Sequence, residues 1–175
     1  MELKTALTLV NTPQLITDTK QVWADLGAGT GFFTQALARY LQPGSTLIAV
    51  DKGKADLEKI PTPKGMILHT IKADFTDSDL KLEGLTGVLM ANSLHYVKDK
   101  TAFIKNIERS FAQEGKGSFL IVEYDTEQAN PWVPYPINFS SLKELFNKAG
   151  YASVVKINET PSVYGAKNIY SAWIS

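Results

Sequence analysis

The feature that most constrains the fold is a glycine-rich turn that follows a short apolar run. Residues 22–26 read Val-Trp-Ala-Asp-Leu, which is typical of a buried strand, and Gly27, Gly29 and Gly31 follow before a helix-like segment. Glycine reaches positive φ angles and lets the backbone approach a ligand closely. The first turn of a helix offers free N–H groups and a positive dipole end. The segment therefore predicts a strand, a ligand-binding turn and a helix.

An acidic residue after the second strand narrows the kind of ligand. Asp51 follows the strand-like run at 46–50, where a carboxylate can accept hydrogen bonds from two ribose hydroxyls. Both segments together predict a site for an adenosine-containing cofactor. The dinucleotide pattern G-x-G-x-x-G needs a third glycine where this chain has Phe32, so the sequence disfavours an NAD-dependent oxidoreductase.

The glycine turn also carries a family resemblance. Residues 25–31, Asp-Leu-Gly-Ala-Gly-Thr-Gly, closely resemble the first motif of class I S-adenosylmethionine-dependent methyltransferases. The resemblance covers about residues 20–175 by the count of expected elements. It implies that Asp51 holds the ribose hydroxyls, whereas the alternative is an acid that only caps the turn after its strand. Asp25 is expected to bind the amides of the turn or the ammonium group of a ligand.

The resemblance assigns a set of cofactor-binding residues. Asp74 is placed near the exocyclic amine of adenine and the backbone N–H of Phe75 near a ring nitrogen, although Asp74 could instead cap a turn. Lys52 could pack along the adenine or be an ordinary surface lysine. The complete expected cofactor site is Asp25, Gly27, Ala28, Gly29, Gly31, Asp51, Lys52, Asp74, Phe75 and Asn92.

The segment after the fourth expected strand bears on catalysis. Residues 92–97, Asn-Ser-Leu-His-Tyr-Val, resemble the family segment beneath the methionine part of the cofactor. They lack the Asn/Asp-Pro-Pro-Tyr pattern, which argues against amino groups of DNA or glutamine as targets. His95 is a candidate general base, and a structural histidine is the equal alternative. Tyr135 is a second catalytic candidate, and His69, inside an apolar strand, is interpreted as structural.

A proline-bearing loop at 124–139 is the other informative segment. It follows the fifth expected strand at the edge where the cofactor is expected, and such loops often carry function. Its aromatic residues could form a substrate wall, or the loop could simply pack onto the next helix. The candidate substrate contacts are Tyr96, Tyr124, Trp132 and Tyr135.

Alternation of strands and helices predicts the fold class. Strands are expected at 22–26, 46–50, 66–71, 87–91, 118–123, 152–157 and 168–174, and helices at about 32–41, 55–59, 100–111 and 140–149. This pattern indicates an α/β, three-layer Rossmann-like sandwich with a mostly parallel seven-stranded sheet. No helix separates the last two strands, so the last strand should be antiparallel. Residues 1–175 form one expected methyltransferase-like domain with a short N-terminal helical segment at about 1–20. Phe32 and Phe33 are expected in the core.

Composition limits the partners. Eighteen basic residues balance 18 acidic ones, which does not favour nucleic acid as a substrate. The chain has no cysteine and two distant histidines, so no metal site is expected. No apolar run is long enough for a membrane span, and a cytoplasmic protein is expected. A homodimer stays open, because the short N-terminal segment leaves the site uncovered unless the 124–139 loop or a second subunit covers it.

The leading hypothesis is therefore an enzyme, an S-adenosyl-L-methionine-dependent methyltransferase that acts on a small-molecule acceptor. The alternative is a non-catalytic domain that binds S-adenosylmethionine or S-adenosylhomocysteine and acts as a partner or sensor.

Overall fold

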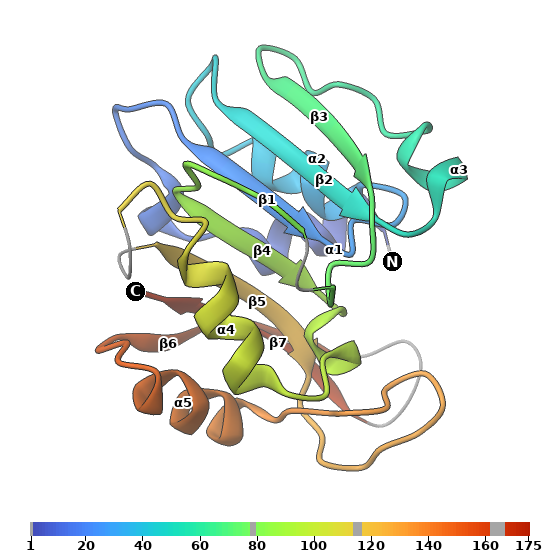
Figure 1. Cartoon of the computed structure of the whole chain (residues 1–175), viewed down its shortest axis with the longest axis vertical. Coiled ribbons are helices and arrows are strands. Elements are labelled where there is room, and N and C mark those ends of the chain that lie inside the picture. The colour runs from blue at the N-terminus through green and yellow to red at the C-terminus, as the bar shows by residue number, and fades with distance from the viewer. Residues whose placement is uncertain (1, 78–79, 114–116, 162–166) are drawn as a thin grey trace.

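A single seven-stranded sheet organises the residues that the computed structural model describes, which are 2–77, 80–113, 117–161 and 167–175. The strand order is β3-β2-β1-β4-β5-β7-β6 (Figure 1). The strands are β1 Val22–Leu26, β2 Thr46–Asp51, β3 Ile67–Lys72, β4 Gly87–Ala91, β5 Ser118–Tyr124, β6 Val154–Pro161 and β7 Asn168–Ile174.

The direction of the strands agrees with the expected fold class. The strands β1 to β5 are parallel to their neighbours, whereas β7 is antiparallel to both β5 and β6. The predicted antiparallel last strand is therefore confirmed, as is the Rossmann-like α/β class. The hairpin places β7 between β5 and β6, so the last strand lies inside the sheet.

Helices cover the two faces of this sheet (Figure 1). One face packs against α4 and α5, and the other against α1 and α2. The helices and 3-10 turns are α1 Leu3–Val10, η1 Pro13–Leu15, α2 Phe32–Ala38, α3 Lys54–Leu57, η2 Leu94–Tyr96, α4 Lys100–Glu108 and α5 Phe139–Lys148. Among the described residues, no helix is both long enough and apolar enough to cross a membrane.

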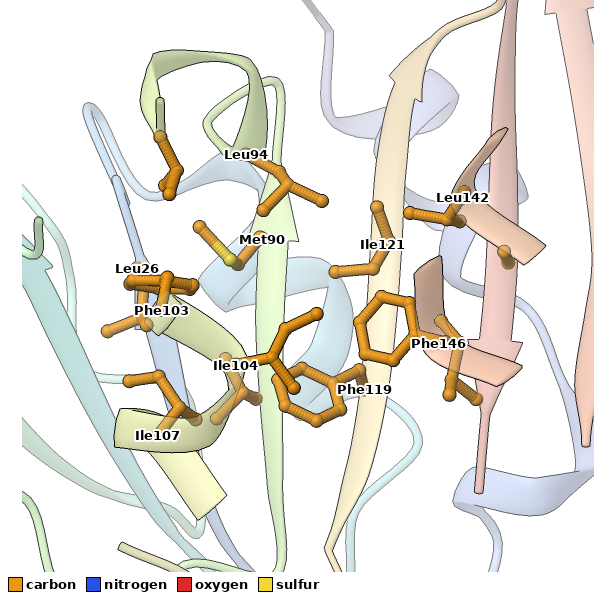
Figure 2. Close-up of a cluster of buried hydrophobic side chains, with 14 of the residues drawn as sticks. Leu26, Met90, Leu94, Phe103, Ile104, Ile107, Phe119, Ile121, Leu142 and Phe146 are labelled. Carbon is orange, nitrogen blue, oxygen red and sulfur yellow. The ribbon is translucent and has the colours of Figure 1, made fainter. Parts of the chain in front are cut away.

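The larger core lies under α4 and α5. Figure 2 shows side chains of β4 and β5 facing those of the two helices, with Met90, Ile104, Phe119 and Phe146 labelled among them. Phe119 and Phe146 are fully or almost fully buried, and their ring centroids are 5.0 Å apart. This layer fixes β4 and β5 side by side, and both strands end at the candidate site.

The helices end earlier than the apolar pattern suggests. The expected helix at 100–111 stops at Glu108, although Phe111 stays buried, with its ring packed edge-on against Phe119. The helix expected at 32–41 stops at Ala38. The apolar periodicity predicts which residues are buried but not where the helix ends. In both places the chain stays buried past the last helical turn.

Candidate ligand site

The glycine-rich turn lies at the carboxyl end of β1 and leads directly into α2. Gly27, Gly29 and Gly31 have φ angles of 86°, 52° and 79°, which residues with a Cβ rarely adopt. The N–H of Gly27 donates to the carbonyl of Val50 at 2.8 Å. A Cβ on Gly27 would lie only 2.6 Å from the Cβ of Ser93. The turn therefore needs glycine both for its shape and for close packing against the segment after β4.

Asp51 connects the end of β2 to this turn. Its Oδ2 accepts a hydrogen bond from the N–H of Gly29 at 2.9 Å, and its Oδ1 accepts one from Gly53 at 2.7 Å. The carboxylate thus caps the turn, as one interpretation of the sequence expected. Each carboxylate oxygen can accept a second hydrogen bond, so the same group can still receive ligand hydroxyls.

Asp25 is a buried acid with one oxygen in use. Its Oδ2 accepts a hydrogen bond from the Thr34 hydroxyl at 2.6 Å. Its Oδ1 is buried and has no hydrogen-bond partner among the described residues. Burial raises the pKa of Asp25 to about 7, the negative charge of Asp51 adds to this rise, and the bond from Thr34 opposes it. An unpaired buried carboxylate oxygen is well suited to a cationic ligand group.

Two adjacent cavities bring most of the predicted cofactor residues together. The larger cavity has a volume of about 420 Å³, and the smaller has about 200 Å³. Pockets for small organic ligands usually measure about 300–1,000 Å³. Gly27, Asp51, Lys52, Asp74, Phe75 and Asn92 line the larger cavity, and Asp25, Gly27, Ala28, Gly29 and Asn92 line the smaller one. Gly27 and Asn92 border both, so the two cavities adjoin and together make up the candidate site.

Gly31 takes a different position from the other predicted residues. It is not in the lining of either of these cavities, and a Cβ on Gly31 would lie 2.7 Å from two side-chain carbons of Ile60. Its glycine is needed for this packing and for its positive φ angle.

Asp74 and Phe75 both line the larger cavity. Oδ1 of Asp74 accepts hydrogen bonds from the Thr76 hydroxyl at 2.7 Å and the Thr76 N–H at 2.9 Å. These bonds hold the pKa of Asp74 below its usual range. Phe75 packs edge-on to Phe103 of α4. Asp74 therefore caps a turn, as the alternative interpretation expected, while it also faces the cavity.

The segment after β4 contributes Asn92 and Ser93. Asn92 has a positive φ of 53°, and its Oδ1 is buried without a partner in the described part of the chain. The Ser93 hydroxyl donates to the carbonyl of Leu26 at 2.6 Å and so holds this segment against β1. Sequence reasoning missed Ser93, because its partner lies 67 residues away in the sequence.

A buried histidine–carboxylate pair lies behind this segment. His95 Nδ1 is 2.7 Å from Oε2 of Glu123, and the backbone N–H of His95 donates to Oε1 at 3.0 Å. Both side chains are almost fully buried. Glu123 was missed from the sequence; the available signal was an acid at the end of an otherwise apolar strand, like Asp25 in β1. His69, in contrast, is exposed on the edge strand β3.

The 124–139 loop meets η2 at one point. The N–H of Tyr135 donates to the carbonyl of His95 at 3.0 Å. Lys100 Nζ donates to the carbonyls of Val97 and Tyr135, both at 2.8 Å, and burial lowers the pKa of Lys100. The loop therefore lies beside η2, at the edge of the sheet where β4 and β5 end (Figure 1).

The structure distributes the predicted substrate contacts unevenly. Tyr96 lines the larger cavity, and the Tyr124 ring lies 6.2 Å from that of His95. The Trp132 side chain is 79% exposed, and Tyr135 is 39% exposed. Neither Trp132 nor Tyr135 is in the lining of the two cavities, so a substrate wall formed by the loop stays a prediction.

The expectation that Phe32 and Phe33 both belong to the core is wrong for Phe32. Phe33 is buried, but Phe32 is 38% exposed. Both residues border the smaller cavity. Consecutive helical residues point about 100° apart, so only one of the two rings can face the sheet.

Comparison with known proteins identifies a family that this chain matches. A family model described as a methyltransferase domain matches residues 24–119. Among curated protein sequences, none matches the chain.

Solved structures share the fold. The CurJ carbon methyltransferase superposes with a TM-score of 0.68 at 15% identity, covering 94% of this chain and 50% of that chain. This chain therefore spans about half of that structure. A magnesium protoporphyrin IX methyltransferase from Synechocystis PCC 6803 with bound S-adenosylmethionine superposes with a TM-score of 0.66 at 14% identity. The match covers 99% of this chain and 78% of that chain. A Thermotoga maritima protein described as a possible histamine N-methyltransferase superposes with a TM-score of 0.67 at 14% identity. The match covers 99% of this chain and 88% of that chain.

Proposed function

The chain belongs to the methyltransferase-domain family, whose cofactor is S-adenosyl-L-methionine, and we propose that it transfers the cofactor's methyl group to a small-molecule acceptor. The unpaired Oδ1 of Asp25, buried at the wall of the smaller cavity, gives the strongest support. A buried carboxylate oxygen that lacks a donor binds an ammonium group well. The methionine part of the cofactor has such a group.

The rest of the two cavities fits the remaining parts of the cofactor. Asp51 would accept hydrogen bonds from the ribose hydroxyls with its free lone pairs. Phe75 and Asp74 would border the adenine, and Asn92 would lie beneath the methionine part with its unpaired Oδ1 available to a donor. The space beside Gly29 is open, since no atom lies within 4 Å of where its Cβ would stand. A ligand could therefore approach the backbone of the glycine turn there.

These residues would act mainly by alignment. The bound cofactor supplies a methyl group on a positively charged sulfur, which is already a good leaving group. The protein must therefore hold the acceptor atom in line with the methyl carbon and keep water away. Ser93 and Tyr96 line the larger cavity, and an acceptor would approach along them.

The charge balance supports a small acceptor. Eighteen basic and 18 acidic residues leave no net charge to attract nucleic acid. The Asn-Ser-Leu-His segment at 92–95 also lacks the pattern associated with amino groups of DNA or protein amides. These features support a low-molecular-weight acceptor.

Calorimetry tests the cofactor part of this proposal. S-adenosylhomocysteine should bind and NAD should not. Asp51→Asn should weaken S-adenosylhomocysteine binding by roughly 10- to 100-fold, because hydrogen bonds to a charged group are each worth about 1.5–3 kcal/mol. Asp18→Asn is a matched control, since Asp18 is exposed and remote from the cavities. Unchanged affinity in Asp51→Asn would show that Asp51 only caps the turn.

A methyl-transfer assay tests the acceptor class. The protein is incubated with S-adenosylmethionine labelled on the methyl group and a cell extract, which is then separated into low-molecular-weight and macromolecular fractions. Label should appear in the low-molecular-weight fraction and be reduced with Asp51→Asn. Label in protein or nucleic acid instead would overturn the small-molecule proposal, and binding without any transfer would favour a sensor.

A further inference from the structure

The His95–Glu123 pair is a buried, polar arrangement that cofactor binding does not use. Glu123 lies near the end of β5 and His95 in the middle of η2, and both are almost fully buried. Both oxygens of the carboxylate are bonded to this one histidine, Oε1 to its backbone N–H at 3.0 Å and Oε2 to Nδ1 at 2.7 Å. The backbone contact holds the carboxylate beside His95, and the Nδ1 contact orients the ring.

This arrangement determines the tautomer of His95. An ionised carboxylate can only accept hydrogen bonds, so the nitrogen that contacts Oε2 of Glu123 must carry the ring proton. In the neutral imidazole the lone pair is then on Nε2. Proton uptake at Nε2 would create an imidazolium in contact with a carboxylate, which is a paired buried charge rather than an isolated one.

The pair lies next to the wall of the candidate site. Asn92 and Ser93 precede η2 and line the larger cavity, and so does Tyr96. The Tyr96 ring centroid is 4.5 Å from that of His95, while the Tyr96 side chain is 47% exposed. His95 itself lines neither cavity, so its imidazole lies behind a residue that does, and an acceptor could reach it only if the Tyr96 ring moved.

We propose that His95 accepts a proton from the methyl acceptor at Nε2, with Glu123 as its positioning residue. The acceptor's attacking atom is then one that carries an acidic hydrogen, a hydroxyl oxygen or an enolisable carbon. The acceptor atom forms a bond to the methyl carbon, the methyl–sulfur bond breaks with its electron pair going to sulfur, and the acceptor's proton goes to Nε2.

An amine acceptor would not need this histidine. A neutral amine attacks with a free lone pair and needs no base beforehand, whereas a hydroxyl or carbon acid gains nucleophilicity when its proton is removed. The inference rests on the proposed function, because it assigns a role within methyl transfer.

Acylation of histidine by diethyl pyrocarbonate tests the inference without a known acceptor. The chain has only two histidines, so the exposed His69 serves as an internal reference in the same molecule. The reaction is run with S-adenosylhomocysteine bound and analysed by mass spectrometry of peptides. We expect His95 to be modified at Nε2. A His95 that stays unmodified after His69 has reacted completely would overturn the proposal, as would modification only when S-adenosylhomocysteine is absent.

Glu123→Gln tests the positioning role. A glutamine amide can donate to Nδ1, which moves the ring proton to Nε2 and removes its lone pair. The modification of His95 should slow several-fold while that of His69 does not change. Glu127→Gln is the matched control, because Glu127 is exposed and bonds only to Asn138 among the contacts described. Equal His95 rates in Glu123→Gln and the control would contradict the positioning role.

His95→Asn separates proton transfer from structure and from cofactor binding. Asparagine can still donate to Glu123, so the folded protein and its S-adenosylhomocysteine affinity should be retained while labelled methyl transfer falls sharply. Transfer at the wild-type rate, or loss of S-adenosylhomocysteine affinity, would overturn the inference. A wild-type protein that does not bind S-adenosylhomocysteine would instead refute the proposed function, whatever the reactivity of His95.

Discussion

Single residues at the ends of β1, β2 and β4 control the electrostatics of the site. Asp25 is the most unusual of them, because it is buried with one oxygen bonded to Thr34 and the other unpaired among the described residues. Burial is the main reason that its pKa is raised to about 7. The ionised form of Asp25 is therefore costly in the free protein and is stabilised when a cation binds.

We expect ligand affinity to depend on pH through Asp25. Below about pH 7 Asp25 takes up a proton and loses its attraction for the ammonium group, so S-adenosylhomocysteine affinity should rise by about tenfold from about pH 6 to about pH 8. Calorimetry at both pH values measures this change. Asp25→Asn should bind more weakly and remove most of the pH dependence, and an unchanged dependence in this variant would assign it to another group.

The stability of the free protein should show the opposite trend. The folded-state pKa of Asp25 lies above its usual value of 3.8, so between about pH 4 and pH 7 the folded protein binds more protons at this group than the unfolded chain does. Asp25 therefore contributes a loss of stability as pH rises through that window.

At the residue scale, the sequence predicts the position of a site residue where the determinant is local. The glycine turn and Asp51 could be recognised because strand, glycines and acid follow one another in a short pattern. Ser93 and Glu123 could not, because the hydroxyl of Ser93 reaches Leu26 and the carboxylate of Glu123 reaches His95. Only the packing of β4 between β1 and β5 brings these partners together.

At the scale of elements, the 124–139 loop is attached to η2 and α4 rather than to a helix face alone. Lys100 of α4 bonds to the carbonyls of Val97 and Tyr135, and Tyr135 bonds to His95. The attachment fixes the Tyr135 end of the loop beside the proposed proton acceptor. Trp132, nearer the middle of the loop, projects into solvent.

We expect the loop's aromatic residues to affect acceptors and not the cofactor. Trp132→Ala and Tyr135→Ala should leave S-adenosylhomocysteine affinity nearly unchanged in calorimetry, because neither residue lines the two cavities. The same variants should reduce labelled methyl transfer. Ile16→Ala is a control for loss of an exposed apolar side chain, since Ile16 is 66% exposed. A large loss of cofactor affinity in Trp132→Ala would contradict this role.

The elements themselves were largely predictable, and their ends less so. Alternating apolar runs located each strand, and Asp99 caps α4 where the sequence placed its start. The helix expected from about 140 starts one residue earlier, at Phe139, and Asn138 is its cap, because its Oδ1 accepts a hydrogen bond from the N–H of Ser141 at 2.8 Å. Asn138, Ser140 and Ser141 all have side chains that can cap a helix, so the sequence alone leaves the first residue of α5 open.

At the scale of the whole molecule, stability depends on the layer between the sheet and α5. Phe119, Phe146 and Tyr151 form an aromatic cluster with centroid distances of 5.0–5.6 Å (Figure 2 shows the two phenylalanines). Burial raises the pKa of the Tyr151 hydroxyl well above its ordinary value. None of the three residues lines either cavity, and the cluster packs β5 against α5.

Phe146→Ala should destabilise the fold without changing the site directly. Removal of a fully buried phenylalanine typically costs about 3–5 kcal/mol, and urea denaturation of the free protein measures it. Phe32→Ala is the matched control, because its ring is 38% exposed and should cost far less. Equal losses in the two variants would mean that the α5 layer contributes little to stability.

The position of β7 has a consequence for folding during synthesis. β7 is the last strand of the sheet in the chain, yet it lies between β5 and β6. While a ribosome is still producing residues 168–174, β5 has an open edge and β6 has no neighbour in the sheet. The first five strands can assemble early, since chains generally fold from the N-terminal side during translation. The edge of β5 must therefore stay protected from other chains until β7 emerges, and the nascent protein is most prone to aggregation in that interval.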